Sequence, residues 1–274
     1  DYTCSSTQIS GMSKNAFESY LFKDGKPMAL TSLNKSDEAP FQYGHLSLKD
    51  ILAVRDKRLA QTIDTVLLYN GRGFTRFNTG MESTSSTGYG VAKYDNEAIP
   101  EGFRSQSGKN YTHAPLFWLS VIYLNYAEAC AELGNITQDD LDKSINLLKD
   151  RAGLPHLNPI VGFSDPANNH GVSDLIWEIR RERRCELMFD NDNRYWDLIR
   201  WHQLDKLDTT KYPDIILGAN VANDMDGCEA NKVGKYIDGS KDGSRIYDKK
   251  HYLYPIPTGQ IALNPQLAPN NPGW

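Results

Sequence analysis

The stretch RRERRCELMFDNDNRYWDLIRW, from Arg180 to Trp201, says most about the fold of this chain. It crowds charge onto a segment that otherwise has the apolar spacing of a packed helix, and we expect a helix over 174–190 and a shorter one over 195–201. Charged residues occupy core-facing positions, where an isolated charge would cost several kcal/mol. We therefore predict a buried, structural ion-pair network made of Glu178, Arg180, Glu182, Arg183, Arg184 and Glu186.

A catalytic interpretation of the same helix would make its three glutamates, Glu178, Glu182 and Glu186, general acids on one face. A general acid needs a pKa near the working pH, whereas neighbouring arginines lower the pKa of a carboxyl group. Arginines stand at four positions between 180 and 184. The scaffold interpretation is therefore favoured.

Two further helices are expected ahead of this stretch, over 116–134 and 138–152. Each segment ends at a glycine of the kind that closes helices, Gly134 and Gly153. The short loop between them predicts an antiparallel pair, the unit of a tetratricopeptide-like repeat. A lone pair cannot bury both of its faces, so we expect it to pack on other helices, including some outside this chain.

One apolar stripe of the first of these helices contains Cys130, in register with Leu119, Ile122, Tyr126 and Leu133. Its position predicts a buried thiol. The four cysteines of the chain are far apart and form no Cys/His cluster, which argues against a zinc site. A disulfide between Cys4 and Cys228 is compatible with an exported protein, but the sequence does not establish it.

The region 69–111 mixes aromatic residues and glycines with polar residues and keeps no helical or alternating period, so we expect loops with a few short strands. Sugar recognition requires flat aromatic faces beside planar polar groups, and this region supplies both. The candidate ligand-binding residues are Tyr69, Phe74, Arg76, Phe77, Tyr89, Tyr94 and Asn96. The alternative is that these aromatic rings fill a small core beneath the loops.

The chain ends with LYPIPTGQIALNPQLAPNNPGW, over 253–274, which predicts a proline-stiffened arm that wraps the surface. Before it, the segment 235–247 predicts two short strands around Asp-Gly turns. The turn interpretation also explains the resemblance of 238–249 to a calcium loop, since Lys249 stands where that loop needs a glutamate. The apolar anchors expected to hold the arm are Tyr254, Ile256, Ile261, Leu263 and Leu267.

Composition narrows the function classes. The formal net charge of −5 argues against a nucleic-acid surface, which needs a basic stripe. No apolar run approaches the roughly 20 residues of a membrane helix, and we find no nucleophile elbow, phosphate-binding loop, metal-ligand pair or cofactor fingerprint. The chain starts at Asp1 without a signal-type segment, so we expect a processed or trimmed product whose targeting signal lies outside it.

Three blocks resemble the C-terminal half of the SusD/RagB family of nutrient-binding surface lipoproteins: WLSVIYLNYAEACAELG, the stretch 180–201 and the stretch 253–274. A shorter element, Arg55-Asp56-Lys57-Arg58-Leu59, resembles an Arg-Asp-Pro-Arg-Leu element of the family. The resemblance implies a mainly α, tetratricopeptide-like scaffold with long irregular loops and a few short β-hairpins. It also implies a single domain over 1–274, without the family's N-terminal helical-repeat half.

The resemblance further implies capture of glycans without catalysis, and delivery to a SusC-like TonB-dependent transporter in the outer membrane. It implies a cell-surface location, held by an N-terminal lipid anchor that is not part of this chain, and no cofactor or metal. Ligand residues of the family lie in variable loops, so none is carried over by motif. Three alternatives stay open: a peptide ligand, a glycan-active hydrolase with two carboxylates across a groove, and a purely structural adaptor.

Overall fold

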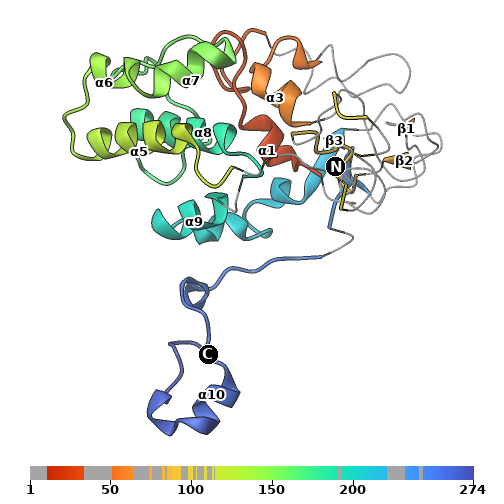
Figure 1. Ribbon diagram of the computed structural model, residues 1–274, viewed down its shortest axis with the longest axis vertical. Coiled ribbons are helices and arrows are strands. Elements are labelled where there is room, and N and C mark those ends of the chain that lie inside the picture. Colours follow the sequence, from red (N-terminus) through yellow and green to blue (C-terminus); the bar gives the residue numbers. More distant parts are fainter. Residues whose placement is uncertain are drawn as a thin grey trace.

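The structure is a computed structural model, and it describes residues 11–33, 51–63, 74–75, 82–83, 85–93, 98–100, 103, 108–109, 113, 115–190, 193–220, 232–240 and 243–274. This part of the chain is mainly helical, as expected (Figure 1). No helix in these ranges is long and apolar enough to cross a membrane. The α-helices are α1 Lys14–Glu18, α3 Lys57–Thr62, α5 Leu119–Glu132, α6 Gln138–Asp142, α7 Ile145–Ala152, α8 Asp174–Glu186, α9 Asn193–Arg200 and α10 Thr258–Leu263.

Helix α8 packs against the helices α3, α5 and α7. It begins at Asp174 because the side chain of Ser173 accepts a hydrogen bond from the backbone N–H of Ile176. It ends at Glu186, before the expected residue 190, and Phe189 has a left-handed backbone with φ of 65°. Apolar side chains of five segments share one core beneath α5 and α8: Leu124, Ala127, Leu141, Ile145, Leu148, Leu157, Ile179 and Leu187.

Helix α5 buries the face opposite to the one that we predicted to be buried. Its buried residues are Ser120, Leu124, Ala127 and Glu128, and the prediction of a buried Cys130 thiol is wrong, because this residue is partly exposed. A buried glutamate is tolerated there because Glu128 is bound by the Arg200 guanidinium and the Trp201 indole N–H. The outward stripe holds the exposed apolar side chains Leu119, Ile122, Tyr126 and Leu133.

The helix expected over 138–152 is broken into α6 and α7. Thr137 and Asp140 form a capping box that starts α6. The break falls at Ser144, whose backbone leaves the helical region (φ −132°, ψ −95°) and whose hydroxyl donates to the Asp140 carbonyl. Helix α7 ends as predicted at Gly153, in the left-handed conformation with φ of 71°. Both pieces still pack against α5.

A second core joins α1 and α3 to a small antiparallel sheet of order β3-β5-β4, formed by Leu217–Asn220, Tyr236–Asp238 and Lys232–Val233. The hairpin expected over 235–247 is therefore wrong, since β5 pairs with β3 and β4 and residues 243–248 form no strand. Gly218 is required in β3 because a Cβ atom there would lie 2.2 Å from the Thr87 carbonyl oxygen. A separate pair, β1 Phe74–Thr75 with β2 Glu82–Ser83, is also antiparallel.

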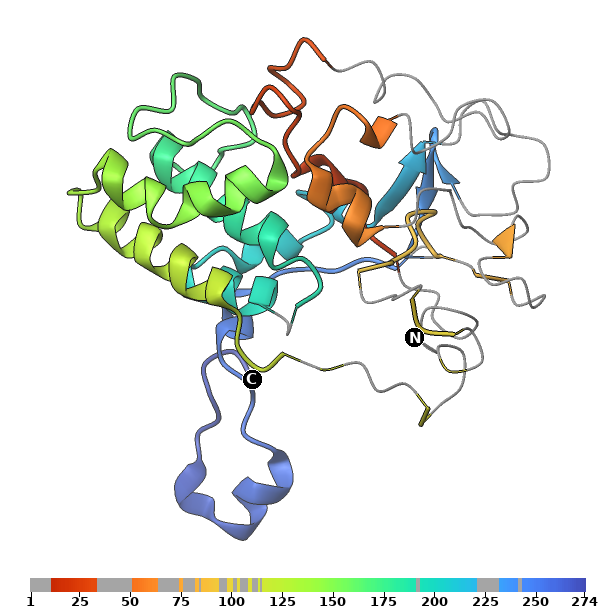
Figure 2. The ribbon, with the colours of Figure 1, turned by 45° about the horizontal axis from the view of Figure 1, so that its top comes forward.

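The last residues form an arm that leaves the body of the molecule in both views (Figures 1 and 2). It contains α10 and short 3₁₀ turns at Lys249–Tyr252 and Pro265–Leu267. The expected wrapping is wrong for three of the five anchors, because Tyr254, Leu263 and Leu267 are exposed, whereas Ile256 and Ile261 are partly buried. The arm instead folds on itself: Asn270 bonds to both backbone groups of Ile256.

Candidate functional site

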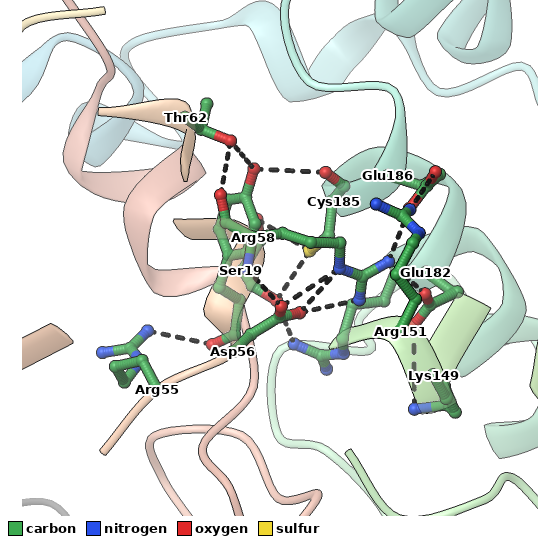
Figure 3. A network of polar contacts seen from close by, with 12 residues as sticks. Ser19, Arg55, Asp56, Arg58, Thr62, Lys149, Arg151, Glu182, Cys185 and Glu186 are labelled. Atoms are coloured by element: carbon green, nitrogen blue, oxygen red, sulfur yellow. Dashed lines mark hydrogen bonds and ion pairs between the residues drawn. The ribbon is translucent and has the colours of Figure 1, made fainter. Parts of the chain in front are cut away.

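The charged stretch forms a buried network in which Arg58, at the start of α3, is the central cation (Figure 3). Its guanidinium binds the carboxylate of Asp56 with Nη2 2.7 Å from Oδ2. Its Nη1 donates to Glu182 and, at 2.9 Å, to Oε2 of Glu186. Lys149 of α7 lies 3.7 Å from the other oxygen of Glu182. Arg58 therefore joins α3 to α8, and Glu182 joins α8 to α7.

The electrostatics of this network suit a scaffold. Burial raises the pKa of Glu182, but the positive charges of Arg58 and Lys149 outweigh burial and leave that pKa lowered. Burial dominates for Glu178 and leaves its pKa raised, although Arg181 lies 3.1 Å from its carboxylate. Neither carboxyl group lines the cavity described below.

The other residues predicted for the network take partners from elsewhere in the chain. Arg183 binds both carboxylate oxygens of Asp197, at 2.8 and 2.7 Å. Arg180 lies 3.1 Å from Glu132 and 3.7 Å from Glu128. Arg184 has no carboxylate within ion-pair distance in the described part of the chain, and donates to the amide oxygen of Asn15 at 2.8 Å.

Helix periodicity did not predict which residues form ion pairs with the charged side chains of α8. Asp56 and Arg58 come from the short element 55–59, and Asp165 and Asp197 lie on either side of α8 in sequence. The one usable signal was the charge of Arg55, Asp56 and Arg58 between apolar flanks, which indicates buried charges that need partners.

The structure gives a mixed answer for the aromatic candidates. Tyr89 is buried, and its ring stacks on Phe17 with 4.5 Å between centroids, so it is a core residue and offers no free face to a ligand. Phe74 belongs to β1. The remaining candidates lie outside the described residues: Tyr69, Arg76, Phe77, Tyr94 and Asn96.

A cavity of about 700 Å³ lies on the other side of α8, between α1, α9 and the segments 165–169 and 203–215. Its size falls within the range of small-molecule sites. Three aromatic side chains line it: Trp177, Trp201 and Tyr212. The sequence interpretation did not find it, because the lining comes from separate segments. Its basic side chains are Arg180, Arg181, Arg184, Arg194, Lys206 and Arg245, and its acidic ones are Glu18, Asp165 and Asp214.

The three cavity carboxylates are already engaged. Glu18 forms an ion pair with Lys14, Asp165 binds Arg181, and Asp214 accepts a hydrogen bond of 2.6 Å from the Asn15 amide. Of the six basic side chains, Arg180 and Arg181 are paired with carboxylates. Within the described residues Arg184, Arg194 and Lys206 form no ion pair, and they leave an excess of positive charge inside the cavity.

Three of these cations have lowered pKa values, and burial is the main cause for Arg184. Burial and the neighbouring Arg184 charge lower the pKa of Arg194 to about 9. Burial, together with Arg194 and Arg184, lowers the pKa of Lys206 to about 7. Within the described ranges neither forms an ion pair, and both lie over aromatic rings: Lys206 Nζ is 4.6 Å from the centre of the Trp177 ring, and the Arg194 guanidinium is 5.9 Å from that of Trp201. Like charges crowded in a partly dry cavity suit an anionic partner.

Comparison with known proteins gives a consistent result. The SusD family model matches residues 4–274. A SusD-like protein from Bacteroides fragilis is 22% identical with a TM-score of 0.57, over 96% of this chain and 47% of its own. The protein BT4246 is 21% identical with a TM-score of 0.66, over 100% of this chain and 48% of its own. The chain thus spans about half the length of the solved structures it matches. No curated protein sequence gives a significant match.

Proposed function

This chain belongs to the SusD family, and we propose on that premise that it captures glycans at the cell surface without cleaving them. Proteins of this family are in general nutrient-binding surface proteins without catalytic activity. The proposal extends to delivery of the glycan to a SusC-like TonB-dependent transporter. It also places the protein on the outer membrane, facing outward and held by a lipid anchor outside this chain. The observation that carries it is the family match over residues 4–274.

The chemistry of the charged residues supports binding rather than catalysis. A glycoside hydrolase needs one carboxyl group with a raised pKa and a second carboxylate across the sugar, both facing the substrate. Among the described residues the carboxyl group with a raised pKa is that of Glu178, and it does not line the cavity. The lining acids Glu18, Asp165 and Asp214 are bound to other side chains.

Two surfaces are proposed to contact the glycan. One is the cavity, where the indoles of Trp177 and Trp201 stand beside hydrogen-bonding side chains. The other is the aromatic loop region, represented by Tyr69 and Tyr94. Rings on both surfaces would give apolar contact area at low entropic cost, and arginine and asparagine groups would bind hydroxyls.

The test is binding of the purified chain to a panel of polysaccharides by affinity electrophoresis and calorimetry, with reducing-end release measured in the same samples. We expect binding without release. Trp177→Ala and Tyr94→Ala should each weaken binding. Trp196→Ala is the matched control, because this indole is exposed and does not line the cavity. Release of sugar would refute the non-catalytic assignment, and no binding to any polysaccharide would refute glycan capture.

A further inference from the structure

We propose that the cavity between α8 and α9 is an anion site that binds the carboxylate or sulfate group of an acidic sugar. The sugar part of this inference rests on the proposed function, whereas the anion site rests on the geometry alone. The groups that would hold the anion are Arg184, Arg194 and Lys206, which line the cavity from α8, α9 and the 3₁₀ turn Leu204–Leu207.

The pairing of the other cations around α8 shows why these three are different. Arg58, Arg181 and Arg183 are buried and each binds at least one carboxylate. Arginine pairs with carboxylates in this way because its planar fork meets both oxygens. In the described part of the chain no carboxylate lies within ion-pair distance of Arg184, Arg194 or Lys206. The acids that act on them from further away are Asp214, Asp197 and Asp205, respectively. Asp214 and Asp197 are already bound to other side chains.

The energetic consequence favours an incoming anion. A cation taken out of water is destabilised unless an opposite charge replaces its hydration, and several cations close together repel one another. An anion that enters the cavity removes both penalties at once. It gains charge-assisted hydrogen bonds from a guanidinium and an ammonium, which are stronger than those between neutral groups.

The rest of the lining points to a sugar acid rather than to a small inorganic anion alone. Trp177, Trp201 and Tyr212 supply apolar surface, and the volume of about 700 Å³ is far larger than a sulfate ion requires. A pyranose that carries a carboxylate or sulfate would place its ring against the aromatic side chains and its charge against the cations. A neutral sugar of the same size would leave the cations without a counter-charge.

The experiment is calorimetry on the 274-residue chain with an oligogalacturonate, with the same oligosaccharide after reduction of its carboxyl groups to alcohols, and with sodium sulfate. The variants are Arg194→Gln and Lys206→Gln, with Arg194→Lys to restore the charge. Arg151→Gln is the matched control, because this arginine is 54% exposed and does not line the cavity. Circular dichroism of each variant separates loss of binding from loss of folding.

We expect the acidic oligosaccharide to bind about tenfold or more tightly than its neutral form, a difference that Arg194→Gln abolishes and Arg194→Lys partly restores. Its affinity should fall as salt concentration rises. Equal binding of the acidic and neutral forms, or full binding by folded Arg194→Gln, would overturn the inference and leave glycan capture standing. Sulfate binding that depends on Arg194, without binding of either sugar, would support the anion site and count against glycan capture. No binding of any of the three probes would overturn both.

Discussion

Replacement of Arg58 by methionine tests the network that joins α3 to α8. The substitution removes the guanidinium but keeps most of the side-chain volume, so the effect on stability comes mainly from charge. Asp56 keeps one hydrogen bond from the backbone N–H of residue 58, and Glu182 keeps Lys149 at 3.7 Å. Both carboxylates, with side chains only 1% and 2% exposed, lose their closest cation.

Removal of one partner from a buried ion pair costs about 3–5 kcal/mol, because the remaining charge is left without compensation. The free energy of unfolding should fall by this amount in urea titrations followed by circular dichroism. Each kcal/mol corresponds to roughly 2–4 °C in Tm for a domain of about this size, so Tm should fall by about 6–20 °C.

The loss of stability in Arg58→Met should depend on pH. Arg58 and Lys149 hold the pKa of Glu182 below its usual value of 4.5 despite burial. A lowered pKa in the folded state stabilises the protein above the unfolded pKa, and this stabilisation is lost as pH falls through the folded value. Without Arg58, burial dominates and Glu182 takes up a proton at a higher pH. The stability difference between the two proteins should therefore be largest near neutral pH and shrink toward pH about 4.

Arg151→Met is a matched control, because Arg151 binds the same Glu186 carboxylate, at 2.5 Å from both oxygens, but from the surface. Because Arg151 is 54% exposed and Glu186 keeps Arg58, loss of this contact should cost about 0–1 kcal/mol. A second change, Glu182→Gln on the Arg58→Met background, should recover part of the loss, because it removes the orphaned charge and leaves an amide oxygen for the buried Lys149. If Arg58→Met costs no more than Arg151→Met, or if the double variant is less stable than the single one, the reasoning is refuted.

Three further outcomes follow from buried or crowded groups. Burial raises the pKa of the Cys185 thiol to about 12, so this thiol should not react with iodoacetamide in the native protein at pH about 8. The partly exposed Cys130 should react, and peptide mass spectrometry would distinguish the two. Gly218→Ala should destabilise the protein by about 1–3 kcal/mol or prevent folding, because the added Cβ atom would lie 2.2 Å from the Thr87 carbonyl oxygen. Gly259→Ala is the control: its Cβ atom would meet nothing within 4 Å, so the free energy of unfolding should change by less than about 1 kcal/mol. Calorimetry should show that the affinity for sulfate falls several-fold between pH about 6 and 8, because Lys206 loses its proton over this range. In Lys206→Gln the affinity should not change with pH. The charged groups that act on this lysine are Arg194, Arg184, Asp205 and Arg180.

The sequence predicted the order and type of the main helices and the buried, charged face of α8, but it predicted the wrong face for α5. Both stripes of α5 carry apolar residues, so periodicity favoured the stripe of Leu119 and Ile122 over that of Leu124 and Ala127. The stripe that is buried includes Glu128, a residue that pattern rules place outside. Its burial depends on Arg200 and Trp201, which lie more than 70 residues later in the chain. Such partners are set by tertiary contacts and leave no local signal.

The candidate binding site also depends on tertiary contacts that the sequence pattern does not predict. Aromatic density drew attention to 69–111, and Tyr89 from that region packs in the core against Phe17. The cavity is lined from segments between Ser13 and Arg245, each of which contributes only a few side chains. No window of sequence contains enough of it to be recognised.

The charges of α8 are best understood by where their counter-charges come from. On the side toward α3 the chain supplies the partner itself, and Glu182 meets Arg58 in a buried, nearly solvent-free contact. On the side toward α9 the chain supplies positive charge to the cavity, with Arg184 and Arg194 close enough for each to lower the pKa of its neighbours. A sequence composed only for stability would have placed an acid or an apolar residue there, since crowded cations weaken the folded state. Within the described residues no acid forms an ion pair with Arg184 or Arg194, and the cost is explained if the counter-charge arrives with the ligand. In that case sulfate or an acidic sugar should raise the Tm of the chain while it leaves the Tm of Arg194→Gln unchanged.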